Sequence, residues 1–67
     1  NMETTENLKF LTTRQLANML SMSHRTLENW RGLGKGPRYR KVGGKILYDM
    51  RDVEDFINTE VVDPNAE

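Results

Sequence analysis

Residues 12–33, TTRQLANMLSMSHRTLENWRGL, contain two short helical patterns separated by a serine-rich turn. Thr12 and Gln15 are three residues apart, which predicts a capping box at the start of a first helix over about residues 13–20. The second helix is predicted over residues 24–33, directly after a serine that can cap it. Two helices of this length joined by three residues are typical of a helix-turn-helix.

The apolar residues of this stretch predict how the two helices pack. Leu16, Met19 and Leu20 follow one another at helical spacing and predict the buried face of the first helix. In the second helix Leu27 and Trp30 share a face, and we expect Trp30 to pack in the core rather than to stack on a ligand. The remaining side chains of the second helix are polar and are expected to face solvent or a partner.

A β-hairpin is predicted after the second helix. Three glycines and a proline in residues 32–37 end the helix. Strands are expected at about residues 38–42 and 45–48, because the intervening pair Gly43-Gly44 tolerates the positive φ angles of a tight turn. The side chains expected to pack this hairpin against the helices are Val42, Ile46 and Tyr48.

A third helix is predicted over residues 50–60, with Asp49 as its cap. Val53, Phe56 and Ile57 form its apolar stripe. The sequence therefore predicts one small α+β domain of three short helices and a two-stranded hairpin. The expected domain organisation is a flexible segment at residues 1–9, a folded domain at residues 10–60 and a flexible acidic tail at residues 61–67.

Charge is distributed unevenly along a chain whose net charge is zero. Residues 24–51 carry eight cations and two acids, a net charge of +6, whereas residues 52–67 carry six acids and no cation. Such asymmetry indicates a middle segment that faces a polyanion and an acidic segment that faces away from it. The alternative is that the two segments pair with each other in the fold, and the pI of about 6.8 is below the basic value typical of nucleic-acid-binding domains.

Composition argues against several classes of protein. The chain has no cysteine, which excludes a disulfide framework and thiolate zinc sites, and it has a single histidine. No apolar run approaches the ~20 residues of a membrane-spanning helix, and no motif of a catalytic or phosphate-cradling site is present. We therefore expect a cytoplasmic protein that is not an enzyme and that uses no metal or cofactor.

The polar residues at the start of the second helix are candidate contacts to DNA. A helix fits the major groove, where base edges are exposed. Arg25 can donate two hydrogen bonds to a guanine, Asn29 can pair with an adenine, and Glu28 can accept from a cytosine amino group or repel phosphate. His24 is a further candidate, and Ser23 and Thr26 can bond to phosphate. Alternatively, all of these are ordinary solvated side chains.

The hairpin supplies a second candidate surface. Arg38, Arg40, Lys41 and Lys45 lie on or beside the glycine turn, and a projecting basic hairpin can follow phosphates or enter a minor groove. The simpler alternative is a hairpin whose charges serve solubility. Because the second helix independently indicates DNA binding, we expect the hairpin and the helix to share one face, with the acidic third helix on the far side.

The combined pattern of residues 11–57, LTTRQLANMLSMSHRTLENWRGLGKGPRYRKVGGKILYDMRDVEDFI, resembles the MerR-like winged-helix domains of the excisionase and AlpA type. The resemblance lies in five features in a fixed order. They are LTT at residues 11–13 with Gln15 and Ala17, the serine-rich turn, Thr26 and Trp30 followed by GKGP at residues 34–37, the basic hairpin with its turn glycines, and Tyr48 followed by Val53 and Phe56. It implies a winged helix-turn-helix whose second helix, the recognition helix, enters the major groove, and whose hairpin, the wing, contacts the backbone or minor groove.

The resemblance also implies roles for particular residues. It places Ser23, Arg25, Thr26, Asn29 and Arg31 on the recognition helix, and Arg40, Lys41, Gly43, Gly44 and Lys45 on the wing. With the residues found above and Lys35, a further cation of residues 24–51, the full set of candidate DNA contacts is Ser23, His24, Arg25, Thr26, Glu28, Asn29, Arg31, Lys35, Arg38, Arg40, Lys41, Gly43, Gly44 and Lys45.

The resemblance implies a function as well. The long dimerising helix and effector region of MerR regulators have no counterpart in this sequence, which favours an excisionase. Such a protein binds and bends attachment-site DNA, several copies side by side, and directs an integrase toward excision. The alternatives are a small AlpA-like or MerR-like transcriptional regulator and a protein-interaction adaptor whose acidic helix docks a basic partner.

Overall fold

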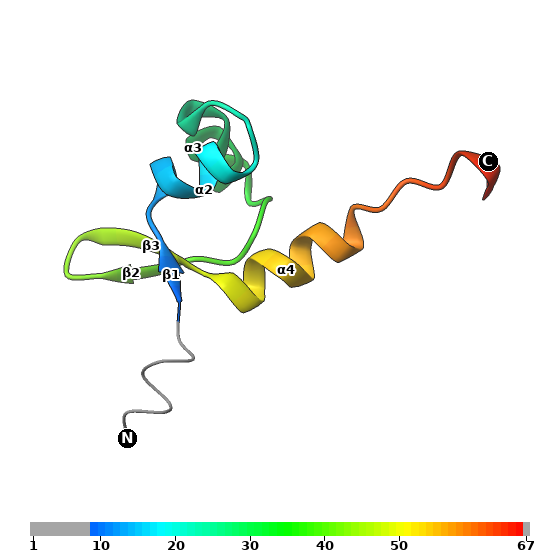
Figure 1. Ribbon diagram of the computed structural model, residues 1–67. Helices are drawn as coiled ribbons and strands as arrows, with labels where there is room; N and C mark the ends of the chain where they lie inside the picture. Colours follow the sequence, from blue (N-terminus) through cyan, green and yellow to red (C-terminus); the bar gives the residue numbers. More distant parts are fainter. Residues whose placement is uncertain (1–8, 67) are drawn as a thin grey trace, which may run out of the picture.

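The computed structural model describes residues 9–66, and this part of the chain forms three α-helices, a three-stranded antiparallel sheet and a short 3-10 helix (Figure 1). In chain order the elements are β1 (Phe10–Leu11), α2 (Thr13–Met19), α3 (His24–Leu33), β2 (Arg40–Val42), β3 (Lys45–Asp49), α4 (Met50–Thr59) and η1 (Pro64–Ala66). The small α+β winged helix-turn-helix fold is confirmed. The flexible segment expected at residues 1–9 lies outside the described residues except for Lys9.

The capping box of α2 forms as the sequence predicts. Gln15 donates its backbone N–H to Oγ1 of Thr12 at 3.2 Å, and the Thr12 backbone N–H donates to Oε1 of Gln15 at 2.9 Å. Two of the N–H groups that a helix start leaves unpaired are thereby satisfied. The helix is two turns long and ends at Met19, one residue before the expected end, with Leu20 as its C-cap.

The other two helices also begin at the expected caps. Oγ of Ser23 accepts from the Arg25 backbone N–H at 3.1 Å, and Oδ1 of Asp49 accepts from the Arg51 backbone N–H at 2.9 Å. Helix α3 ends at Leu33, and its C-cap Gly34 has a φ of 71°, the left-handed conformation that glycine adopts without steric cost. The position of the recognition helix in the chain is therefore fixed at both ends by local chemistry.

The wing is the hairpin of β2 and β3. Its register pairs Arg40 with Leu47 and Val42 with Lys45, on either side of a two-residue turn. Both turn residues have positive φ, 57° at Gly43 and 82° at Gly44, as expected for this type of hairpin turn. The strands differ slightly from expectation, because β2 begins at Arg40 and β3 extends to Asp49.

The sheet has three strands, and the expectation of a two-stranded sheet is therefore corrected. Strand β1 pairs antiparallel with β3, Phe10 opposite Asp49 and Leu11 opposite Tyr48, so that the order is β1-β3-β2. The backbone N–H of Met50 continues this pairing to the carbonyl of Lys9 at 3.0 Å. A strand of two residues shows no alternation of polar and apolar side chains, so the sequence gives no periodic signal for it.

The core lies where α2, α3 and α4 meet β3. Its fully buried residues are Leu16, Ala17, Leu27, Tyr48 and Val53, and Leu11, Leu20, Met22, Trp30 and Ile46 pack around them. Eight of the eleven apolar residues that the sequence predicts to pack are thereby confirmed as buried or half-buried. None of the described helices has the length and apolar content needed to cross a membrane.

Three residues expected in the core are instead exposed by 40 to 55%, namely Met19, Val42 and Ile57. Helix α2 buries Leu16 and Ala17, so Met19 falls at the margin of its buried face. Val42 shares a sheet face with its partner Lys45, and this is the face opposite to the one that packs on the helices. Ile57 lies in the part of α4 that leads away from the sheet (Figure 1).

Candidate nucleic-acid interface

The recognition helix α3 is oriented by the side that it buries. Leu27 is fully buried and Trp30 is half-buried against Phe56 of α4, with ring centroids 5.8 Å apart. Arg25 and Asn29 are one turn apart on the opposite side of the helix, and both are exposed. The two residues with the best chemistry for reading bases therefore project together into solvent.

A shallow hollow of about 410 Å³ joins the recognition helix to the wing. Its lining includes His24 and Glu28 of α3, Lys45 of β3 and Arg14 of α2. Nε2 of His24 lies 3.9 Å from Oε2 of Glu28, an ion pair only when the histidine is protonated. The structure thus brings the start of the recognition helix and the turn end of the wing to one hollow.

The hydroxyl groups at the helix start have different environments. Ser23 is exposed, and its Oγ already accepts the capping bond from Arg25, so its O–H remains available to donate. Thr26 is half-buried, and its backbone N–H donates to the carbonyl of Ser23 at 3.0 Å. Of the two, Ser23 is the better placed for a phosphate oxygen.

The tip of the wing is a thin, cationic ribbon. Lys41, Gly43, Gly44 and Lys45 are all exposed. Lys41 is paired with Ile46, and these two residues share the sheet face that packs toward the core. Lys45 is paired with Val42 on the opposite face. Cations on both faces of a glycine-tipped hairpin are arranged to meet phosphates on the two sides of a groove.

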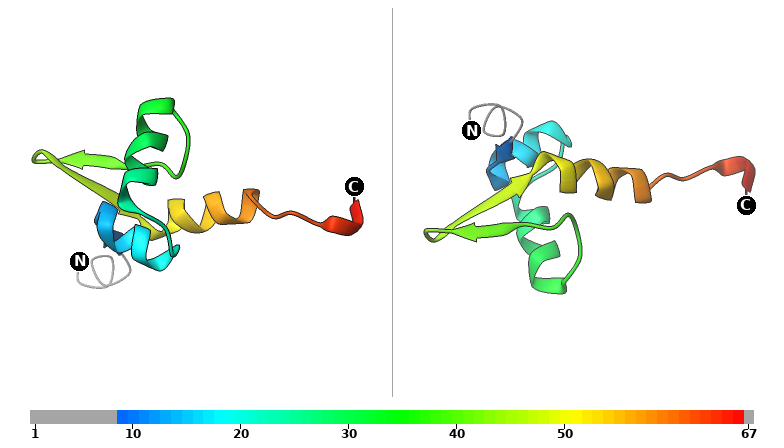
Figure 2. Two further views of the ribbon diagram at one scale, coloured as in Figure 1. Left: turned by 90° about the horizontal axis from the view of Figure 1, so that it is seen from above. Right: turned by 90° about the horizontal axis from the view of Figure 1, so that it is seen from below.

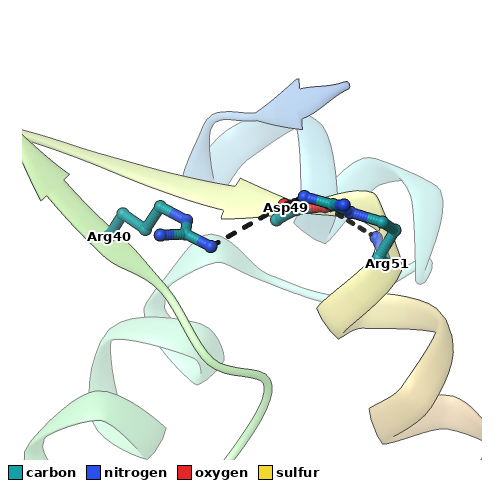
Figure 3. Close-up of polar contacts among 3 residues, drawn as sticks. All are labelled: Arg40, Asp49 and Arg51. Carbon is teal, nitrogen blue, oxygen red and sulfur yellow. Dashed lines mark hydrogen bonds and ion pairs between the residues drawn. The ribbon is translucent and has the colours of Figure 1, made fainter. Parts of the chain in front are cut away.

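The base of the wing contains an ionic cluster (Figure 3). Asp49, only 2% exposed, lies between Arg40 of β2 and Arg51 of α4. Its Oδ2 is 2.7 Å from Nη2 of Arg51 and 3.9 Å from Nη2 of Arg40. Hydrogen bonds from the Arg51 side chain, and then from its backbone N–H, lower the pKa of Asp49 to about 2. Arg40 therefore lies near a buried acid, whereas within residues 9–66 no ion pair of Lys41 or Lys45 at the tip of the wing is found.

Arg31 is directed into the protein rather than away from it. Its Nη1 donates to the Tyr48 hydroxyl at 2.8 Å and to Oγ1 of Thr13 at 3.2 Å. The guanidinium carbon lies 5.6 Å from the centroid of the Tyr39 ring. The sequence placed Arg31 among the DNA contacts but gave no indication of these intramolecular partners.

Lys35 and Arg38 lie in the loop between α3 and β2, at the edge of a hollow of about 480 Å³ that Asp52 also lines. Arg38 borders a second hollow with Asp52 and Asp55 of α4. The acidic helix was expected to lie wholly on the far side of the cations, and at its first two turns this is wrong. Beyond those turns, α4 and the tip of the wing extend in opposite directions (Figure 2). The acids therefore adjoin Arg38 but leave the wing tip free.

Arg14 is a candidate that the sequence interpretation did not include. It is exposed at the start of α2 and lines hollows on both sides of His24, one of them shared with Lys45. In a helix-turn-helix the first helix crosses the DNA backbone. The sequence did contain a signal for this contact, namely a cation in the first turn of the first helix. Arg14 lies three residues before the buried Ala17.

Comparison with known families shows a match over most of the described residues. The family described as a helix-turn-helix domain matches residues 10–60, and it includes excisionase-like and AlpA-like proteins. Among curated proteins none matches the chain.

Proposed function

The chain belongs to this helix-turn-helix domain family, and from that membership and the geometry of its surface we propose that it binds specific sequences of double-stranded DNA. The recognition helix α3 enters the major groove, and the wing contacts the flanking phosphates or the minor groove. Members of such families are typically not enzymes. The surface needs no cofactor or metal for this function.

One observation carries the proposal. Arg25 and Asn29 project from the side of α3 opposite to the buried Leu27, next to a hollow that the recognition helix shares with Lys45 of the wing. Arg25 offers two donors to O6 and N7 of guanine, and Asn29 offers a donor and an acceptor to adenine. Glu28 accepts from a cytosine amino group on the wing side of the same helix.

The wing supplies affinity rather than base recognition. Lys41 and Lys45 neutralise phosphates on the two sides of a groove, and the side-chain-free turn Gly43-Gly44 lets the backbone approach the DNA closely. Ser23 and Thr26 add contacts to phosphate at the start of the recognition helix. The remaining cations of this segment lie nearer to Asp49 and to the acids of α4, and they add to the positive electrostatic potential around the site. They are Lys35, Arg38 and Arg40.

The biological role that we propose is that of an excisionase, a factor that bends attachment-site DNA in the cytoplasm and directs an integrase toward excision. The family match includes proteins of that kind. A single small module buries only about 600–1,000 Å² on DNA, so several copies binding cooperatively to adjacent sites would supply the affinity that one lacks. A transcriptional regulator of the AlpA type would use the same surface.

The test of DNA binding is a salt titration with a random-sequence duplex. If the wing and recognition helix together neutralise about six phosphates, affinity falls on the order of 10³-fold between 50 and 200 mM salt. Absence of binding at low salt would instead favour an adaptor that docks a basic partner on the exposed acids of α4. An integrase gene beside this one, together with bending of the bound duplex in a gel assay, would separate an excisionase from a regulator.

A further inference from the structure

One guanidinium group connects the recognition helix to the elements that must be held beside it. Arg31 lies in the last turn of α3, and its Nη1 donates both to Tyr48 of β3 and to Thr13 of α2, at 2.8 and 3.2 Å. Tyr48 is 1% exposed, so its hydroxyl is held by the core around it. The contact therefore fixes α3 to β3, one of the two strands of the wing.

The surroundings of Arg31 restrict how it can move. The Tyr39 ring lies 5.6 Å from the guanidinium carbon and itself packs against Tyr48, with ring centroids 6.1 Å apart. A planar guanidinium held between an aromatic ring and two hydroxyl oxygens has few alternative orientations. Because Tyr48 and Lys45 are three residues apart on β3, a rotation of α3 about this contact changes the spacing between the recognition helix and the wing.

We propose that Arg31 is a positioning residue that sets the recognition helix at a fixed spacing from the wing, and that it does not itself contact phosphate. This inference rests on the proposed function. Two surfaces that enter neighbouring parts of a duplex must match its geometry closely. A contacting group displaced by about 1 Å loses most of its hydrogen-bond energy. Loss of Arg31 therefore reduces binding to the preferred sequence far more than binding to random DNA.

Lysine distinguishes this role from a phosphate contact. A lysine at position 31 keeps the positive charge but has a shorter side chain and lacks the planar guanidinium, which lies over the Tyr39 ring while its Nη1 reaches both hydroxyl oxygens. For a phosphate contact, Arg31→Lys retains most of the affinity and Arg31→Met does not. If Arg31 is a positioning residue, the two variants lose a similar amount of affinity for the selected duplex, since both disrupt the hydrogen bonds to Tyr48 and Thr13.

The experiment measures affinity for two probes, a duplex selected from a random library by the native protein and a random-sequence duplex, each over a range of salt. Arg31→Lys, Arg31→Met and Tyr48→Phe should each weaken binding to the selected duplex about tenfold. Their affinity for the random duplex and their salt slopes should stay close to native. Asn58→Ala, on the exposed part of α4, is the control and should change neither quantity.

Tyr48→Phe also guards against loss of the fold, because it removes only the acceptor oxygen and keeps the buried ring. Denaturant unfolding at the assay temperature shows which variants are folded. The inference is overturned if Arg31→Lys binds like the native protein while the salt slope of Arg31→Met falls by about 0.9, or if Tyr48→Phe binds normally. If the native protein itself shows no salt-dependent binding to either duplex, the proposed function fails, which is a separate result.

Discussion

Oδ2 of Asp49 lies 2.7 Å from Nη2 of Arg51, two residues further along the chain, at the point where β3 passes into α4. The same carboxylate caps α4 through the Arg51 backbone N–H and lies 3.9 Å from Arg40 at the base of the wing. One buried acid thus stabilises the start of a helix and offsets one of the two positive charges beside it. This junction orients the wing relative to the rest of the domain.

The Asp49 cluster predicts a dependence of stability on acid. The pKa of Asp49 falls from 3.8 to about 2 in the folded protein, chiefly through the side-chain hydrogen bonds from Arg51. A carboxyl group with a lowered pKa contributes its stability above the unfolded value and loses it as pH falls through the folded value. The difference in free energy of unfolding between the native protein and Asp49→Asn should therefore be constant above about pH 5 and shrink toward pH 2.

Denaturant titrations of both proteins across this pH range measure that difference. Other carboxyl groups titrate in the same range, but they are common to the two proteins and cancel. A difference that does not change between pH 5 and 2 would show that the Asp49 carboxylate is not held by Arg51 in solution.

Arg25→Ala should relax base preference. Its side chain is exposed on the outer side of the recognition helix and can make a bidentate contact to guanine. Loss of that contact should cost about 1–3 kcal/mol of binding to the selected duplex and remove discrimination at one base position. Competition with duplexes that vary one base at a time measures both effects, and unchanged discrimination at every position would exclude Arg25 from base recognition.

Lys45→Ala should weaken binding to all duplexes similarly and lower the salt slope by about 0.9, since it removes one phosphate contact from the tip of the wing. Arg38→Ala is the matched comparison, because Arg38 is also an exposed cation but borders Asp52 and Asp55. Its salt slope should change less than that of Lys45→Ala. Equal changes for the two variants would mean that the acids of α4 do not weaken the contribution of Arg38.

Gly32→Ala should make the protein more stable and the complex weaker. Gly32 lies in the recognition helix without a positive φ, and a Cβ there would meet no atom of the described residues within 4 Å. Replacing a helical glycine by alanine raises the free energy of unfolding by about 1 kcal/mol. Because position 32 follows Arg25 and Asn29 on the same exposed side, the added methyl group should hinder close approach of DNA. A gain in stability with unchanged affinity would show that DNA does not approach this turn.

Features with a strong local cause could be predicted from the sequence. The caps at Thr12, Ser23 and Asp49 each depend on a short polar side chain next to a helix start, and all three form. The turn at Gly43-Gly44 was equally predictable, because few other residues adopt its backbone angles. These signals determined the order and the bounds of the main elements to within two residues.

Features that depend on contacts distant in sequence could not be predicted. Strand β1 exists because Leu11 meets Tyr48 far along the chain, and its two residues carry no pattern of their own. Nothing in the sequence distinguishes Arg31 from Arg25, the other cation of the recognition helix, because the bonds of Arg31 to Tyr48 and Thr13 form only in the fold. The charge of residues 24–51 correctly indicated a basic surface, but not that α4 begins beside Arg38.

The central claim is that the recognition helix and the wing form one DNA-binding face from which the acidic part of α4 is excluded. It is tested most directly by following backbone amide NMR signals while a duplex is added at low salt. The account predicts shifts concentrated at residues 23–29 and 41–45, with residues 54–60 unaffected. Shifts concentrated in α4, or none at all, would contradict it.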